Sequence, residues 1–190
     1  KAVANDLVVK NPAAHLDKMK RAPKKPRESF TRDEVDKMMK ELPDNKIGWS
    51  IRLLLFTGMR PGEILGLEPR HIAKDGSWIN IEQATVKVKG TTEIGPPKTV
   101  DSYRTVPVPE LVRYCARNLR NTDKKFIWES PKKPGFPCSD SYYRTLHKEA
   151  IEALDGVRSL NPYSCRHTCI SHMIALGVDP ITIISITGHV

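Results

Sequence analysis

The chain has 190 residues, enough for one domain with a substantial hydrophobic core. It carries 31 Lys and Arg against 22 Asp and Glu, and the net charge of +9 favours a polyanionic partner. No apolar run approaches the roughly 20 residues that a membrane span needs, and nothing at the start resembles a signal peptide, so we expect no membrane partner.

Residues 1–27 are strongly basic, with eight Lys or Arg against two Asp, a net charge of +6. The stretch from Lys18 to Arg27 also contains two prolines. Such a segment can be a solvated linker or a strap that faces DNA, and the sequence leaves both open. We take Lys24, Lys25 and Arg27 as its candidate DNA-binding residues.

Three helices are predicted in the stretch that follows. Residues 31–34 read Thr-Arg-Asp-Glu, a capping box that should open a helix reaching about Glu41. Apolar residues at helical spacing predict a second helix that ends near Phe56, with Gly58 behind it. A third, short helix should follow Pro61, because proline is tolerated in the first turn of a helix.

The middle of the chain changes its hydrophobic period. Residues 78–88 are rich in Ile and Val, and residues 103–108 alternate, so we expect a small antiparallel sheet over about 78–108. A helix should follow over about 110–119. The apolar residues 126–128 predict a short strand.

The last part of the chain predicts three more helices, over about 139–154, 162–177 and 179–188. A proline near the start or a glycine at the end marks the last two. The expected fold class is α+β, a mainly helical domain with a small antiparallel sheet.

The four cysteines form no C-x-x-C pair and are too few for a disulfide scaffold. Cys165 and Cys169 lie one helical turn apart with His167 and His172 nearby, which leaves a metal site as an alternative to buried, reduced thiols. We favour the thiols, and we expect no metal, no cofactor and a reducing compartment, the cytoplasm.

Two predicted helix starts carry an arginine where a bound phosphate would lie. Arg60 precedes Pro61, and Arg166 lies four residues after Pro162. The N–H groups of a helix start favour an anion, and a guanidinium adds a planar fork that matches phosphate oxygens. The simpler alternative for each arginine is a solvated surface charge.

Four short motifs occur in order between residues 57 and 189. The first, T-G-x-R-x-x-E-x-x-x-L, is matched by Thr57, Gly58, Arg60, Glu63 and Leu67. The second, P-K-T-x-x-S-x-R-x-x-P, is matched by Pro97, Lys98, Thr99, Ser102, Arg104 and Pro107. The third, H-x-x-R-H-T, and the fourth, L-G-H, are matched in part by residues 163–168 and 187–189. Together they resemble the catalytic domain of the tyrosine recombinases, the phage integrase family.

The resemblance implies a transesterification in which a tyrosine attacks a DNA phosphate, forms a 3′-phosphotyrosyl link and frees a 5′-hydroxyl, with no metal. Arg60 and Arg166 would clamp the phosphate. Glu63 would orient Arg60, or its charge would only stabilise the start of its helix. Lys98 would donate a proton to the departing oxygen. His189 would donate a hydrogen bond to the phosphate in the transition state.

Tyr163 stands where the family usually has a histidine. Its hydroxyl can keep a hydrogen bond to the phosphate, but its reference pKa near ~10 disfavours proton transfer at neutral pH. The alternative is a packed aromatic residue with no catalytic role. We do not take Tyr163 as the nucleophile, because the family places that tyrosine after the L-G-H motif and this chain ends at Val190.

We therefore expect residues 28–190 to be a recombinase catalytic domain that stops before its nucleophile, and residues 1–27 to be a linker from an absent upstream DNA-binding domain. The expected protein is an integrase of a phage or transposable element that assembles on double-stranded DNA, and the 190-residue fragment is expected to be inactive. The alternative, which Tyr163 favours, is a non-catalytic DNA-binding relative. No G-x-x-x-x-G-K-[ST] loop for ATP is found.

Overall fold

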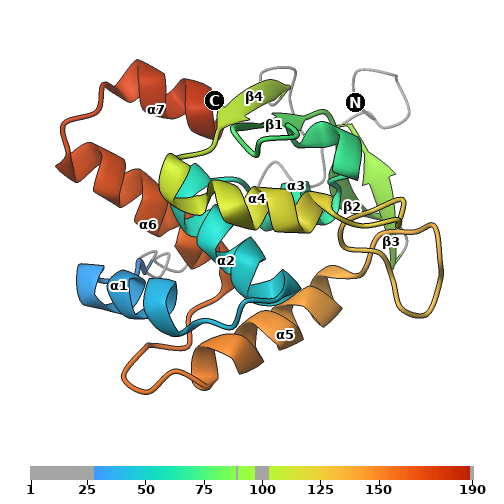
Figure 1. The fold of residues 1–190 in the computed structure, drawn as a ribbon, viewed down its shortest axis with the longest axis horizontal. Helices are drawn as coiled ribbons and strands as arrows, with labels where there is room; N and C mark the ends of the chain where they lie inside the picture. Colours follow the sequence, from blue (N-terminus) through green and yellow to red (C-terminus); the bar gives the residue numbers. More distant parts are fainter. Residues whose placement is uncertain (1–27, 89, 97–102, 189–190) are drawn as a thin grey trace, which may run out of the picture.

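The computed structural model describes residues 28–88, 90–96 and 103–188 (Figure 1). Among these residues, seven α-helices surround and flank two pairs of short antiparallel strands. The predicted fold class, a mainly helical α+β domain, is confirmed.

Helix α2 (Lys46–Thr57) is the centre of the domain (Figure 1). The Asn45 side chain caps its start by accepting from the Gly48 backbone N–H at 3.1 Å, and Gly58 ends it in a left-handed conformation with φ of 64°. The helix is apolar on almost every side because α1, α4, α5 and α6 all pack around it. Its buried residues therefore form the middle of the hydrophobic core.

The other helices follow in chain order. They are α1 (Arg32–Glu41), α3 (Pro61–Leu65), α4 (Arg113–Arg120), α5 (Asp140–Glu152), α6 (Pro162–Ala175) and α7 (Pro180–Thr187). Two short 3₁₀ turns, η1 (Pro69–His71) and η3 (Glu110–Val112), precede β1 and α4 respectively. The helix predicted from residue 110 thus begins with a 3₁₀ turn.

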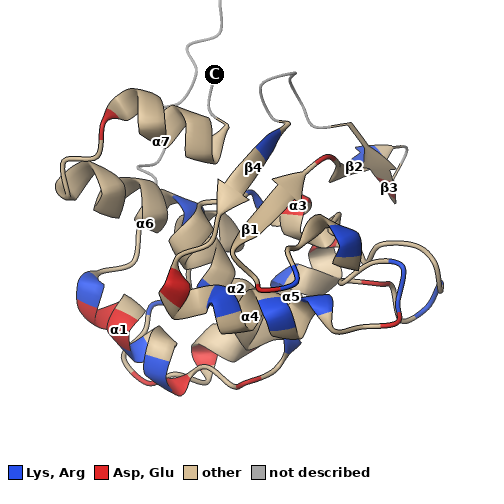
Figure 2. Ribbon diagram, turned by 45° about the horizontal axis from the view of Figure 1, so that its top comes forward, with Lys and Arg blue, Asp and Glu red and all other residues tan. Residues whose placement is uncertain are grey.

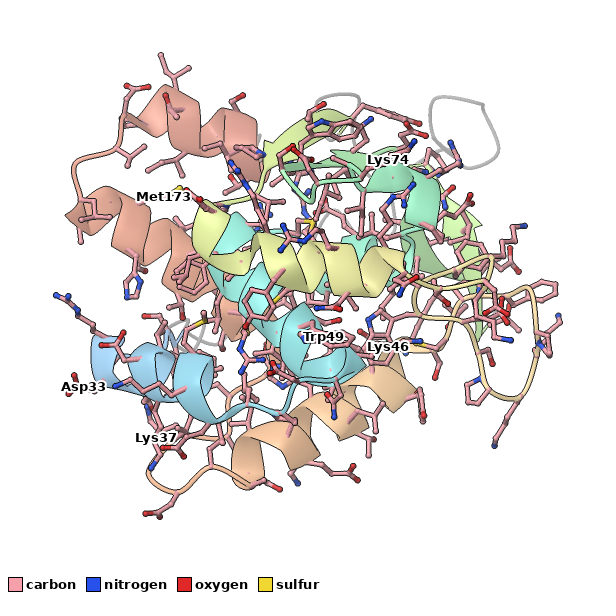
Figure 3. The ribbon with its side chains drawn as sticks, viewed as in Figure 1. Asp33, Lys37, Lys46, Trp49, Lys74 and Met173 are labelled. Atoms are coloured by element: carbon pink, nitrogen blue, oxygen red, sulfur yellow. The ribbon has the colours of Figure 1, made fainter. Side chains whose placement is uncertain are left out.

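Helix α1 has the predicted capping box. The Thr31 hydroxyl accepts from the Glu34 N–H at 3.3 Å, and the Glu34 carboxylate accepts from the Thr31 N–H at 2.7 Å. The same carboxylate accepts from the Arg158 guanidinium at 2.7 Å, and these bonds hold the pKa of Glu34 at about 2. Asp33 and Lys37 lie on the outer side of α1, away from α2 (Figure 3).

The strands form two separate pairs instead of the one predicted sheet. β1 (Trp78–Ile81) pairs with β4 (Arg104–Pro107), and β2 (Ala84–Val88) pairs with β3 (Thr91–Gly95), both antiparallel. β1 and β4 bury alternate side chains in the core, whereas the β2–β3 hairpin is largely exposed and rests on α3. An isolated two-stranded hairpin is only marginally stable, and here packing against α3 supplies the support that a further strand would otherwise give.

The strand predicted at residues 126–128 is wrong. Phe126, Ile127 and Trp128 are all buried, which a strand with alternating faces does not do against a single core. The segment makes single backbone bonds instead, from Ile127 N–H to the Leu67 carbonyl at 2.9 Å and from Cys138 N–H to the Trp128 carbonyl at 2.7 Å.

The four cysteines are free and buried, and burial raises the pKa of Cys165 to about 12. Within the described residues, no group of three or more His, Cys, Asp or Glu side chains is placed to hold a metal ion. No described helix is both long and apolar enough to cross a bilayer.

The buried imidazole of His147 should make the stability of the fold depend on pH. Its side chain lies in the core, and desolvation lowers its pKa to about 4. The unfolded chain binds a proton near pH 6.5 while the folded chain stays neutral, so stability falls as the pH drops from about 6.5 towards 4. Between pH 7 and pH 5 the loss from this group is about 2 kcal/mol.

Urea unfolding of the wild type and of His147→Gln at pH 7 and pH 5 measures this effect. We expect the variant to lose less stability than the wild type over the interval. Burial also lowers the pKa of His71, which acts in the same direction and is present in both proteins. Equal losses in the two proteins would contradict the assignment to His147.

Candidate active site

Arg60 lies at the start of α3 and is fixed from two sides. Its Nη1 donates to the Glu63 carboxylate at 2.7 Å, and its backbone N–H donates to the same carboxylate at 2.8 Å. Its Nη2 donates to the carbonyl of Gly188, the residue that ends α7. The side chain remains 28% exposed, so part of the guanidinium faces solvent.

Arg166 lies at the start of the second turn of α6 and is almost fully buried. Its Nη1 donates to the carbonyl of Gly58 at 2.5 Å, two residues before Arg60. Burial lowers the pKa of Arg166 to about 10, and the nearby positive charge of Arg60 is the second largest cause. The group still carries its charge at neutral pH, and the structure brings the two sequence-predicted arginines together at one turn of the chain.

Glu63 is the buried acidic partner in this cluster. Besides the Arg60 bonds, its two carboxylate oxygens accept from Arg104 at 3.0 and 2.9 Å in a bidentate pair. Burial acts to raise the pKa of Glu63, but the bonds from Arg104 and Arg60 outweigh it and hold the pKa below its usual value. Glu63 is therefore an ionised carboxylate that bonds to both Arg60 and Arg104.

Arg104 is the residue whose importance sequence reasoning missed. The second motif includes it, yet no role was assigned to it there. Its side chain is only 6% exposed, and its Nε donates to the Ile186 carbonyl in the last turn of α7 at 2.7 Å. The available signal was its place in the same motif as Lys98, at the first position of a strand.

Tyr163 lies near the start of α6 and is 41% exposed. Its ring faces the Arg144 guanidinium of α5, with 5.9 Å from the guanidinium carbon to the ring centroid. It lines a small polar cavity together with Gly62 at the start of α3 and Thr85 of β2. Tyr163 thus borders the helix start that carries Arg60.

The other predicted site residues lie outside the described part of the chain. These are Lys24, Lys25, Arg27, Lys98 and His189. Two described residues lie near them in sequence. Arg104 follows Lys98 in the same motif, and Gly188, whose carbonyl accepts from Arg60, precedes His189.

The described cluster contains three guanidinium groups and one carboxylate. Figure 2 shows basic segments on β4 and α6 and an acidic segment on α3 close to the end of α7. With one negative charge against three positive charges, the cluster keeps an excess of positive charge at neutral pH. Preorganised donors of this kind stabilise negative charge that develops on a phosphoryl group.

Similar proteins are found by sequence and by structure. The tyrosine recombinase XerA of Pyrococcus furiosus is 26% identical over 179 residues, which cover 89% of this chain and 57% of that protein. The tyrosine recombinase XerC of Staphylococcus epidermidis is 24% identical, over 85% of this chain and 53% of that protein. The chain therefore spans little more than half the length of these relatives.

Among solved structures, the Tn1549 transposon integrase in complex with a circular intermediate DNA superposes with a TM-score of 0.78 at 19% identity. The match covers 99% of this chain and 66% of that one. The crystal structure of the XerA recombinase gives a TM-score of 0.66 over 88% of this chain and 58% of that one. At these identities the likeness shows the shared fold. The model of the phage integrase family matches residues 28–190, and the chain belongs to that family.

Proposed function

We propose that this chain is the catalytic domain of a tyrosine recombinase, an integrase of a phage or transposable element that cuts and rejoins double-stranded DNA through a 3′-phosphotyrosyl intermediate. The observation that carries the proposal is that Arg60 and Arg166 lie at the same backbone turn. Arg166 donates to the Gly58 carbonyl in that turn, and Arg60 is paired with buried Glu63. The family match and the fold of the Tn1549 integrase support it.

In this proposal the two arginines bind the non-bridging oxygens of the scissile phosphate. They supply the positive charge that metal ions supply in many other phosphoryl-transfer sites. Lys98 protonates the departing 5′-oxygen, and His189 donates a hydrogen bond to the phosphate. Tyr163 takes the place of a histidine and braces the phosphate through its hydroxyl.

None of the five tyrosines of the chain is proposed as the nucleophile. Tyr143 is fully buried, and burial raises its pKa well above the usual value. Tyr114 is partly buried, and burial raises its pKa to about 12. Tyr103 directly precedes β4 and Tyr142 lies on α5, and neither element carries Arg60 or Arg166. Tyr163 is proposed to brace the phosphate instead.

Several further features fit this function. The net charge of +9 suits a DNA partner, and the basic segment 1–27 would add contacts to the DNA backbone. Self-assembly on DNA belongs to the same proposal. The four buried, free cysteines support a cytoplasmic location, where thiols stay reduced.

Loss of either arginine should abolish most DNA cleavage. In a longer protein that contains this chain and continues past Val190, Arg60→Ala or Arg166→Ala should lower the cleavage rate by about 10²–10³, the scale for one preorganised donor. Arg→Lys should restore little, because the planar fork is lost. Cleavage of a nicked suicide duplex, followed on a denaturing gel, measures both. Near wild-type rates for both alanine variants would refute the clamp.

Covalent trapping tests the nucleophile assignment. We expect the 190-residue chain to form no adduct with a suicide duplex, and we expect the longer protein to form one. An adduct of the 190-residue chain that disappears in Tyr163→Phe would make Tyr163 the nucleophile. A longer protein that binds DNA and never forms an adduct would support the second candidate, a non-catalytic DNA-binding relative, which the replacement of histidine by Tyr163 favours.

Binding of duplex DNA should depend strongly on salt. Each phosphate neutralised contributes a slope of about −0.9 to log affinity against log salt concentration. Deletion of residues 1–27 should weaken binding and flatten that slope, because those residues carry a net charge of +6. Fluorescence anisotropy at several salt concentrations measures the slope, and an unchanged slope would show that the segment is only a linker.

A further inference from the structure

We propose that Arg104 is a positioning residue that holds Arg60 and the end of α7 in their working places through buried Glu63. This inference rests on the proposed function, but it concerns a residue to which sequence reasoning gave no role. Arg104 has no assigned contact with the phosphate; it acts through its neighbours.

Arg104 and Glu63 form a buried bidentate ion pair. Arg104 presents two nitrogens to the two oxygens of Glu63, at 3.0 and 2.9 Å, and the side chains are 6% and 2% exposed. A bidentate pair fixes both the place and the plane of a carboxylate. Because Glu63 also accepts from the guanidinium and the backbone N–H of Arg60, the orientation of Arg60 depends on where Arg104 holds that carboxylate.

Arg104 also balances the charge of the buried Glu63 carboxylate. A buried carboxylate with a single partly exposed partner would be costly, and a second guanidinium offsets that cost. Arg104 therefore allows Glu63 to stay ionised beside Arg60. Without Arg104, Glu63 would keep its bonds to the guanidinium and the backbone N–H of Arg60 but would lose the bidentate pair that fixes the plane of its carboxylate.

Arg104 and Arg60 both bind backbone carbonyls at the end of α7. The Ile186 carbonyl accepts from Arg104 Nε at 2.7 Å, and the Gly188 carbonyl accepts from Arg60. The C-terminal carbonyls of a helix carry partial negative charge and favour cations. A Cβ added to Gly188 would lie 3.0 Å from Nη1 of Arg104, so the guanidinium packs directly on this residue. Figure 1 shows the end of α7 beside β4. The bond from Arg104 of β4 to the Ile186 carbonyl joins the two elements.

The consequence is a link between three motifs that are far apart in sequence. Arg104 belongs to the motif of Lys98, Glu63 and Arg60 to the first motif, and Gly188 to the last. A shift of β4 would therefore move Arg60 and the end of α7 together. Displacement by about 1 Å of a group that contacts the reacting atoms can cost about 10²-fold in rate.

The test uses Arg104→Lys, which keeps the charge and loses the bidentate fork. Arg52→Lys is the matched control, because the Arg52 side chain is also well buried, at 3% exposed against 6% for Arg104, and bonds to the carbonyls of Met39 and Leu42 at the end of α1. In the longer protein, we expect Arg104→Lys to lower single-turnover cleavage at saturating protein at least about tenfold, with DNA affinity changed less than threefold. Arg52→Lys should lower the Tm and leave the cleavage rate of the folded protein unchanged.

A second readout needs no activity. In the 190-residue chain, the side-chain Nε–H NMR signal of Arg60 should shift or broaden in Arg104→Lys, and the signal of Arg52 should stay in place. If Arg104→Lys unfolds below the assay temperature, both readouts are taken on all the proteins at a temperature below its Tm, with the same expected losses. Cleavage within threefold of the wild type together with an unmoved Arg60 signal would overturn the proposal.

The two proposals can fail separately. A wild-type longer protein that forms no adduct would count against the recombinase function, while the Arg60 signal would still decide whether Arg104 positions it. An active wild type with an Arg104→Lys variant that cleaves normally would count against the positioning role alone.

Discussion

The buried carboxylate of Glu63 is the contact on which the rest of the site depends. It accepts from Arg60 on one side and from Arg104 on the other; Arg60 and Glu63 lie at the start of α3, whereas Arg104 comes from β4. Burying a charge is unfavourable unless it is paired and hydrogen-bonded, so the site exists only in the folded arrangement that brings β4 beside α3. Removal of either arginine would leave the buried carboxylate with one guanidinium partner in place of two.

The apolar frame around this contact explains why it can be so rigid. Helix α2 is buried on nearly every side and ends at Gly58, whose left-handed conformation turns the chain directly into the segment of Arg60. The carbonyl freed at that turn accepts from Arg166 of α6. A close-packed core therefore sets the distance between two cationic groups that would otherwise repel each other.

Local features were predictable because their causes are local. The Thr31–Glu34 capping box, the glycine that ends α2 and the proline that opens α6 each act within a few residues, and the structure contains all three. Strand pairing was less predictable because partners are chosen by tertiary contacts. The β2–β3 hairpin rests on α3 instead of extending the β1–β4 pair, and residues 126–128 are buried on all sides without a ladder.

By itself the sequence determined the family and the order of the helices, and it singled out two arginines as candidates, because these depend on motif wording and on short-range capping. Only the tertiary structure decided which charges meet. Arg104 and Glu63 are 41 positions apart, and Arg60 and Gly188 are 128 apart. No periodicity or spacing encodes such a contact. It arises because packing of β4, α3 and α7 places one buried carboxylate within hydrogen-bond distance of two guanidinium groups.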